Sequence, residues 1–398
     1  MISDYGQAEK IYCDFCSIIS VEYDLYFLVQ MVIEAQRIIH VTNFGFKPVK
    51  AYLHNTGVKL SNGWIRGGHH VINFSDRDIA KWRAFLGHRK WGVSVTNQML
   101  LELCRSIKPD VVAFGHADII TAETIAHICA ELPDVRMLQW NVDWLVPSEL
   151  ALKGDPTAEN NKIKILSKAD VLDATFVTTA GSVLEEMSKP KHPVCFMPNP
   201  VDLSIERCRN FEKDNLPFDV FFASNSEDDR RYHCGAWHHM DVFCRDMAKS
   251  APDLRLALPG IGGQPKVFGP EYQGLLGQCR IGLNISRRND QYLYSSDRIA
   301  QMIGNGLVIC VDRASGYGDI FSDDEMVFYS SEDELFKKLS ALKKDDSRRK
   351  RIGEAGWKKY SELFNSSVVA QYMLDVVMGH AAALQGISQS RTLSRVAK

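Results

Sequence analysis

Short apolar runs of strand length alternate along the chain with segments in which apolar residues follow helical spacing. Apolar runs bounded by turn residues indicate strands, whereas apolar residues three and four positions apart indicate helices. The pattern predicts strands at 48–54, 71–74, 109–114, 136–140, 174–177 and 194–197, and then at 218–223, 255–258, 281–285, 307–311 and 326–329. It predicts helices at 121–132, 236–250, 270–278, from about 295, and at 332–342, 347–364 and 367–384. This alternation indicates an α/β fold with mainly parallel sheets.

One segment, 203–216, interrupts the alternation with prolines, charges and little periodicity, and we expect a domain boundary in it. The organisation predicted is a helical extension at 1–40, a Rossmann-like domain at 41–205, a second at 206–385, and a flexible tail at 386–398. Two doubly wound domains joined by one linker leave a cleft between their sheets. Clefts at domain junctions are favoured ligand sites.

Composition narrows the function classes without selecting one. The chain has 398 residues, of which 45% are apolar and 24% charged, and a net charge of −2, which gives no support for a dedicated nucleic-acid binder. Ten scattered cysteines and the lack of an export signal at the start favour a reduced, cytoplasmic protein. Cys13 and Cys16 form one CxxC pair, which we interpret as helix packing because zinc needs about four ligands.

The stretch 282–311 carries the strongest functional pattern. It predicts a buried strand, a polar loop, a helix start and a second buried strand. The loop and helix start are rich in hydroxyls and arginines: Ser286, Arg287, Arg288, Tyr292, Ser295, Ser296 and Arg298. A helix N-terminus at the carboxyl end of a parallel strand favours anions, so this stretch predicts a site for a nucleotide phosphate. A solvated loop in an ordinary strand–helix–strand unit is the alternative.

The same stretch resembles a known family. The run SDRIAQMIGNG at 296–306 resembles the nucleotide-binding element of family 1 and family 4 type GT-B glycosyltransferases. Over 280–376 the chain is similar to the spore-maturation-type group, and SNGWIRGGHHV at 61–71 resembles the glycine-rich first loop of these enzymes. Gln301 stands where the family has a glutamate for the ribose. The acidic loop SNSEDDRRYH at 224–233 resembles that of retaining β-Kdo transferases, which use CMP-Kdo and an aspartate nucleophile.

This resemblance, together with the strand-end positions, predicts the site residues. The catalytic candidates are Asp228, Asp229, His233, Asp118, Asp143 and Glu159. Donor contacts are expected from Arg66, Gly67, Gly68, Ser224, Asn225 and Gln301, besides the loop residues named above. Glycosyl transfer needs a carboxylate near the anomeric carbon and donors on the leaving phosphate. Loop solvation, helix capping and turn geometry are the alternative roles of these residues.

The function predicted is transfer of a sugar from a nucleotide-sugar donor to a bacterial surface glycan such as lipopolysaccharide O-antigen, without a metal or other cofactor. The acceptor expected is lipid-linked. The basic run at 343–351 and the tail arginines would then contact an anionic membrane at its inner face. A UDP- or GDP-sugar transferase with front-side displacement, a non-catalytic nucleotide-sugar-binding protein and an epimerase-like relative are the alternatives.

Overall fold

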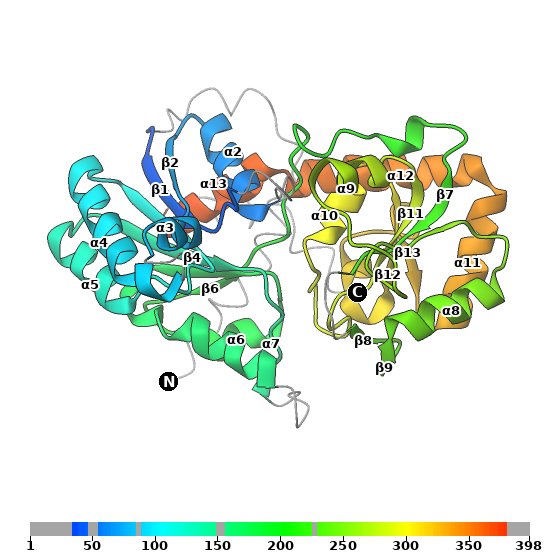
Figure 1. Cartoon of the computed structure of the whole chain (residues 1–398), viewed down its shortest axis with the longest axis horizontal. Coiled ribbons are helices and arrows are strands. Elements are labelled where there is room, and N and C mark those ends of the chain that lie inside the picture. The colour runs from blue at the N-terminus through cyan, green and yellow to red at the C-terminus, as the bar shows by residue number, and fades with distance from the viewer. Residues whose placement is uncertain (1–33, 47–54, 85–88, 149–155, 225–228, 380–398) are drawn as a thin grey trace, which may run out of the picture.

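The structure is a computed structural model that describes residues 34–46, 55–84, 89–148, 156–224 and 229–379. It contains two α/β domains side by side (Figure 1). The N-terminal domain has a six-stranded sheet in the order β2-β1-β3-β4-β5-β6, with every neighbouring pair parallel. Its strands are β1 (Arg37–Thr42), β2 (His70–Phe74), β3 (Val111–Gly115), β4 (Arg136–Asn141), β5 (Ala174–Val177) and β6 (Val194–Phe196).

Helices connect these strands: α2 (Thr56–Arg66), α3 (Asp76–Trp82), α4 (Arg89–Ile107), α5 (Ala122–Glu131), α6 (Pro156–Leu166) and α7 (Ser182–Met187). Strand β3 is fully buried and β1 is buried after its first residue, because helices cover both faces of the sheet. Helix α5 begins after Thr121, whose hydroxyl accepts a hydrogen bond from the backbone N–H of Thr124 at 3.1 Å.

The C-terminal domain has a five-stranded parallel sheet in the order β10-β7-β11-β12-β13. Its strands are β7 (Phe218–Phe221), β10 (Leu256–Ala257), β11 (Cys279–Asn284), β12 (Val308–Asp312) and β13 (Val327–Tyr329). Helices α8 (Met240–Ser250), α9 (Gly269–Leu276), α10 (Arg298–Gly304), α11 (Glu332–Lys344) and α12 (Asp346–Phe364) pack around it. An antiparallel hairpin, β8 (Arg230–His233) and β9 (Ala236–His239), lies between β7 and α8 in the sequence.

The last described helix, α13 (Ser366–Val377), leaves the C-terminal domain and packs against α2 of the N-terminal domain (Figure 1). The indole N–H of Trp64 on α2 donates to the carbonyl oxygen of Ala370 at 2.8 Å. Where α12 gives way to α13, the chain runs beside the interdomain linker. The N–H of Val201 donates to Phe364 O at 2.9 Å, and Ser366 N–H donates to Val201 O at 2.7 Å.

The expected α/β architecture of two parallel sheets is confirmed, and most predicted elements lie within a few residues of the observed ones. Three expectations are wrong. Residues 37–42 form the interior strand β1 rather than part of a helical extension, so a boundary at residue 41 divides a strand. The segment expected as a glycine-rich loop forms α2, because Asn55 caps it and its apolar face packs on α13. Residues 236–239 pair with β8, so the helix expected there begins only at Met240.

Two other expectations concern the ends of the chain. The segments 1–33 and 380–398 lie outside the described residues, and so does the strand expected at 48–54. Helix α13 was assigned to the C-terminal domain from the sequence, yet it contacts α2, β4 and β5 of the other domain. An amphipathic helix at the end of a chain gives no sign of which sheet it will cover.

Candidate active site between the two domains

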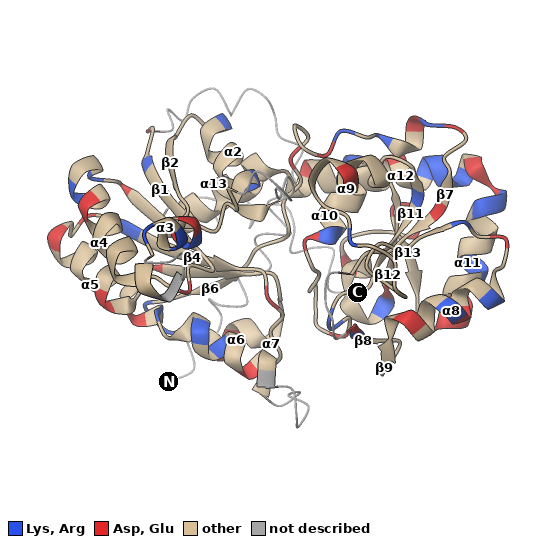
Figure 2. Cartoon of the chain, in the orientation of Figure 1, with Lys and Arg blue, Asp and Glu red and all other residues tan. Residues whose placement is uncertain are grey.

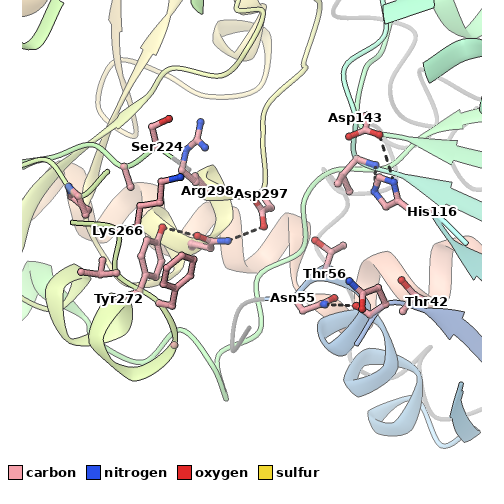
Figure 3. A pocket seen from close by; sticks show the side chains of 18 of the residues that line it. Thr42, Asn55, Thr56, His116, Asp143, Ser224, Lys266, Tyr272, Asp297 and Arg298 are labelled. Carbon is pink, nitrogen blue, oxygen red and sulfur yellow. Dashed lines mark hydrogen bonds and ion pairs between the residues drawn. The ribbon is translucent and has the colours of Figure 1, made fainter. Parts of the chain in front are cut away.

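A cavity of about 530 Å³ lies between the domains, at the edge where the carboxyl ends of both sheets face each other (Figure 3). Its N-terminal wall consists of Thr42, Asn43, Asn55, Thr56, Arg77, His116, Trp140, Val142 and Asp143. Its C-terminal wall consists of Ala223, Ser224, Pro259, Lys266, Val267, Phe268, Gly269, Tyr272, Asp297, Arg298 and Gln301. Ligands of open α/β sheets bind at this edge. The cavity therefore lies where the topology predicts a site.

The C-terminal wall presents an ordered set of polar groups. The phenol of Tyr272 donates to Gln301 Oε1 at 2.7 Å, and Gln301 Nε2 donates to Asp297 Oδ2 at 2.8 Å (Figure 3). This chain of hydrogen bonds fixes the orientation of the Gln301 amide. Burial raises the pKa of Tyr272, so its hydroxyl stays protonated and keeps donating. The Asp297 carboxylate and the amide oxygen are then acceptors for hydroxyl groups of a ligand.

Positively charged side chains lie close to Ser224, which follows β7. Its hydroxyl donates to Asp229 Oδ1 at 2.7 Å and accepts from Arg231 Nη2 at 3.1 Å. Burial and the nearby Arg298 lower the pKa of Arg231 to about 10, which leaves it charged at neutral pH. Burial raises the pKa of Asp229, although Ser224 and Arg231 oppose the shift. With Arg298 and Lys266 on the same wall, three cations face two carboxylates, Asp229 and Asp297, and this excess of positive charge suits an anionic ligand.

The N-terminal wall carries a histidine and a carboxylate at the ends of β3 and β4. His116 Nδ1 lies 3.6 Å from Asp143 Oδ2, and its Nε2 accepts a hydrogen bond from Val142 N–H at 3.3 Å. Because Nε2 is the acceptor, the proton of the neutral ring is on Nδ1, on the side of Asp143. Burial lowers the pKa of His116, so the ring is neutral at pH 7. The pair provides a basic group at the cavity surface.

A smaller cavity of about 120 Å³ adjoins the first and shares Arg77, His116, Trp140 and Asp143 with it. Its other polar lining groups are Asp118, Gln139, Asn141, Lys164, Ser167 and Lys168. Arg77 donates to Asp118 Oδ1 at 2.6 Å. The two cavities therefore meet at the four shared residues of the N-terminal domain.

The structure brings several of the residues predicted from the sequence to this space. Ser224, Arg298, Gln301 and Asp143 line the main cavity, and Asp118 lines the smaller one. Asp229 lies directly behind Ser224 and is not part of the lining. Asp228 and Asn225 lie outside the described residues.

Other predicted residues lie elsewhere. Arg66 lies at the end of α2, where its guanidinium contacts Asp202 at 2.9 Å and Ser366 Oγ at 3.1 Å, and Gly67 and Gly68 end the same helix. Glu159 is exposed on α6. Arg66, Gly67 and Gly68 stabilise a helix end or a domain contact because α2, which was expected to be a loop, directs its C-terminus away from the cavity.

Most side chains of the predicted phosphate loop, 286–296, bond within the protein and do not line the cavity. Ser286 and Ser296 hydrogen-bond to each other through the Ser296 N–H, and Ser295 donates to Asn284 Oδ1 at 2.8 Å. The remaining side chains also have partners within the C-terminal domain or at its edge. Arg288 pairs with Asp290, Tyr292 donates to Asp319, and Arg287 lies over the rings of Trp144 and Trp237. His233, a catalytic candidate from the sequence, is buried at the end of β8 and does not line the cavity.

Some lining residues were missed by the sequence analysis: Thr42, Asn43, Asn55, Thr56, Arg77, Lys266, Tyr272 and Asp297. The Asn-Thr-Gly sequence at 55–57 does contain a signal, because Asn55 Oδ1 accepts from Gly57 N–H at 2.7 Å as a helix cap. Arg77 and Lys266 follow no local pattern, since their position depends on how the domains face each other.

Comparisons with known proteins agree with this geometry. Residues 237–375 match a family model described as glycosyl transferase-like. A comparison with curated protein sequences gives no match. Among solved structures, an alpha-glucosyltransferase in complex with UDP and DNA is similar to the chain with a TM-score of 0.57, 11% identity, and coverage of 86% of this chain and 100% of that one.

Two further structures show the same arrangement. A UDP-forming alpha,alpha-trehalose-phosphate synthase from Burkholderia xenovorans has a TM-score of 0.55 and 11% identity, with 87% of this chain and 99% of that chain covered. Anabaena HepE in complex with UDP and glucose has a TM-score of 0.53 and 10% identity, with 86% and 100% covered. At such low identities the likeness establishes the fold. The chain therefore has the GT-B fold, with a C-terminal domain similar to glycosyltransferases.

Proposed function

We propose that the protein is a glycosyltransferase that binds a nucleotide sugar in the cavity between its two domains. One observation carries the proposal. The cavity has cations and hydroxyl acceptors on its C-terminal wall and a carboxylate with a neutral histidine on its N-terminal wall. A donor spanning the two walls would place its phosphate by Arg298 and its sugar toward Asp143. The glycosyl transferase-like match over 237–375 supports this assignment.

The leaving phosphate is neutralised in this proposal by protein groups instead of a metal ion. Arg298 and Lys266 line the wall, and Arg231 lies behind Ser224 with most of its surface buried. Cations held in a site of reduced water content stabilise developing negative charge more strongly than they would in bulk water. The Tyr272–Gln301–Asp297 chain is the proposed contact for nucleoside hydroxyls.

Asp143 is the proposed catalytic carboxylate, and His116 is its neighbour at 3.6 Å. In one route Asp143 removes the proton of the acceptor hydroxyl; in the other it attacks the anomeric carbon and gives retention through a covalent intermediate. The nucleophile expected from the sequence was in the acidic loop at 224–233. Asp229 of that loop is engaged by Ser224 and Arg231 away from the cavity lining, which favours Asp143 for either role.

The donor is either CMP-Kdo or a UDP- or GDP-sugar. The similar structures include UDP complexes, which supports a uridine nucleotide. Arg77 supports the first alternative, because it places a guanidinium on the N-terminal wall, where a carboxylate-bearing sugar such as Kdo would lie. The resemblance of the loop at 224–233 to β-Kdo transferases points the same way.

The acceptor proposed is a bacterial surface glycan such as lipopolysaccharide O-antigen, lipid-linked and reached from the inner face of the membrane. Among the described residues, no helix is both long enough and apolar enough to cross a bilayer. In the basic run at 343–351, some of the basic side chains form ion pairs within the protein. Arg349 is buried against Asp346, and Lys350 pairs with Asp214. Lys344, Arg348 and Arg351 remain exposed for contact with anionic lipid.

The test combines nucleotide binding with transfer. Thermal shifts with CMP, UDP, GDP and their sugars identify the base, since a ligand at about 100 times its Kd adds roughly 2.7 kcal/mol of stability. Asp143→Asn should then lower transfer by at least about 100-fold, the usual contribution of general acid–base catalysis, with nucleotide binding unchanged. The matched control is Asp170→Asn, an exposed aspartate that pairs with Lys189.

Three outcomes separate the alternatives. Nucleotide binding without donor hydrolysis or transfer would show a non-catalytic binding protein, and interconversion of the sugar without an acceptor would show an epimerase. A sugar attached to the protein in intact-mass spectra would establish the covalent route. Full transfer activity in Asp143→Asn would refute the catalytic role of that residue.

A further inference from the structure

A group of metal-ligating side chains lies at the tip of the β8–β9 hairpin, apart from the residues that line the cavity. His233 ends β8, His238 lies on β9, and Glu332 begins α11. Their ligand atoms lie within 4.8 Å of one another. Three separate elements thus place two imidazoles and one carboxylate around a common point.

The polar atoms of this group lack other partners. Both ring nitrogens of His233, Nε2 of His238 and Oε1 of Glu332 are buried and make no hydrogen bond to any described residue. The His233 side chain is 0% exposed. Buried polar atoms in native proteins are almost always paired, so a buried histidine with two unpaired nitrogens requires an explanation.

The distances suit an ion. His233 Nε2 lies 3.4 Å from Glu332 Oε1, and His238 Nδ1 lies 2.9 Å from the same oxygen. A tetrahedral Zn²⁺ with bonds of about 2.0–2.1 Å separates its ligand atoms by roughly 3.3 Å. The 2.9 Å approach also lacks hydrogen-bond geometry, because Glu332 Oε1 has no hydrogen-bond donor among the described residues.

Charge around the group favours a cation as well. Asp246 and Asp333 lie near Glu332, so the group is surrounded by more negative charge than the Glu332 carboxylate alone provides. Two neutral imidazoles and one carboxylate leave a net charge of about +1 on a bound divalent ion, which the surrounding aspartates offset.

A second arrangement of ligands is less suitable. Cys234 and Asp312 also lie within 4.8 Å of His233. However, both oxygens of Asp312 already accept hydrogen bonds, Oδ2 from Cys234 N–H at 2.6 Å and Oδ1 from Ala314 N–H at 3.0 Å. Asp312 therefore acts as a backbone acceptor that holds the hairpin turn.

We propose that His233, His238 and Glu332 bind a divalent transition-metal ion, with Zn²⁺ as the best fit, and that the ion fixes the β8–β9 hairpin to α11. Nitrogen and carboxylate ligands select such ions over Mg²⁺ or Ca²⁺, which prefer oxygen. The side chains of His238 and Glu332 are 29% and 25% exposed, so the ion has an entry path and a water as fourth ligand.

The ion would also affect the C-terminal wall of the cavity, through strand β8. Strand β8 begins at Arg230 and ends at His233. The proposed ligand His233 and Arg231, which hydrogen-bonds to the cavity residue Ser224, therefore lie on one short strand. Fixing one end of the strand limits the movement of the other. The role is structural, and the inference stands on the hairpin alone, independently of the transfer reaction proposed above.

The experiment uses the full chain without an affinity tag, treated with a chelator and then passed through gel filtration. Zn²⁺ is added in slight excess, and bound metal is measured by mass spectrometry of the ions and by the visible spectrum of the Co²⁺ form. We expect one ion per chain and a higher Tm with Zn²⁺. Loss of an outer-shell partner already costs about 10–100-fold in metal affinity, so His238→Ala and Glu332→Gln should each cost at least tenfold.

Two controls make the result specific. His239→Ala removes the exposed histidine next to His238 and should keep both the ion and the Tm shift. A Cys13→Ser/Cys16→Ser variant tests whether the CxxC pair binds zinc instead, and it should also keep the ion. The proposal is overturned if the chelated wild type takes up no zinc, if His238→Ala and Glu332→Gln bind it as tightly as the wild type, or if only the cysteine variant loses it.

Discussion

Replacement of Lys59 by methionine should strongly destabilise the fold, because it breaks an ion pair that is buried on both sides. The ammonium of Lys59 on α2 lies 2.5 Å from Glu206 Oε1 of the interdomain linker, and it donates to the carbonyl oxygen of Pro200 at 3.1 Å. The two side chains are 1% and 0% exposed. Lys59→Met keeps the length and apolar stem of the side chain but leaves the Glu206 carboxylate buried without its cation.

The magnitude follows from the burial of both partners. Removing one member of a buried ion pair costs about 3–5 kcal/mol, because the other charge stays in a medium that solvates it poorly. The lost bond to Pro200 O adds about 1 kcal/mol. Against a typical unfolding free energy of about 5–15 kcal/mol, this loss is a large fraction of the whole. A second change, Glu206→Gln, removes the stranded charge and keeps an oxygen for the Asp202 N–H, so the double variant should regain much of the stability.

Urea unfolding followed by tryptophan fluorescence and circular dichroism measures the effect. Lys81→Met on α3 is the matched control, because Lys81 is an exposed helical lysine and surface changes usually stay within about 0.5 kcal/mol. If Lys59→Met unfolds at the same urea concentration as Lys81→Met, the buried-charge argument is wrong. If the double variant is less stable than Lys59→Met, the stranded carboxylate is not the cause of the loss.

Three further outcomes are expected. Gly63→Ala should destabilise by about 1–3 kcal/mol, since its Cβ would lie 2.1 Å from the backbone oxygen of Ser366, whereas Gly274→Ala, in open space on α9, should stabilise by about 0.5–1 kcal/mol in the same urea assay. Burial raises the pKa of Asp76 from 3.8 to about 6, so the folded state binds this proton more tightly than the unfolded state. Stability from Asp76 is therefore present at low pH and lost between about pH 4 and pH 6, and Asp76→Asn should flatten that dependence of the urea midpoint; an unchanged slope would contradict it. Tyr272→Phe removes the hydroxyl that donates to Gln301 and should weaken nucleotide binding by about 2–10-fold in calorimetry. An unchanged Kd would show that this chain of hydrogen bonds does not contribute to nucleotide binding.

The sequence predicts the fold well because buried parallel strands are continuous apolar runs. The strand at 174–177 was predicted within its observed limits, and α5 begins at the predicted cap, Thr121. Strand β1 was missed because the run IIHVT contains a histidine. His40 is fully buried, and its ring nitrogens lie 2.8 Å from Ser61 Oγ and 3.0 Å from Trp140 Nε1. Tertiary partners thus allow a polar residue in a central strand.

The site was predictable only where residues follow strand ends. Ser224 follows the end of β7 by three residues and Asp143 follows the end of β4 by two, so the topology brings both to the cavity. Lys266 and Arg77 reach the same cavity from a loop and a helix of different domains, and no local pattern indicates this. The serines at 286, 295 and 296 have the composition of a phosphate loop, yet they hydrogen-bond among themselves, because a buried loop must satisfy its own backbone.

Charge is mixed over both domains. Lys and Arg are interspersed with Asp and Glu along the outer helices in the view of Figure 2, as on α8 and α11. Long-range attraction of an anionic donor by the whole molecule is therefore weak at a net charge of −2. In the proposed function, recognition of the donor would depend on the few cations at the cavity.

The return of α13 to the N-terminal domain means that two stretches of chain join the lobes, and they hydrogen-bond to each other at Val201 and Ser366. We expect two adjacent connections to restrict the relative movement of the lobes more than one connection would, above all rotation about the linker. Cleavage of the chain at Asn365 would leave one connection and free the lobes to rotate. The two walls of the cavity would then no longer be held at a fixed position relative to each other, although each lobe would keep its own sheet.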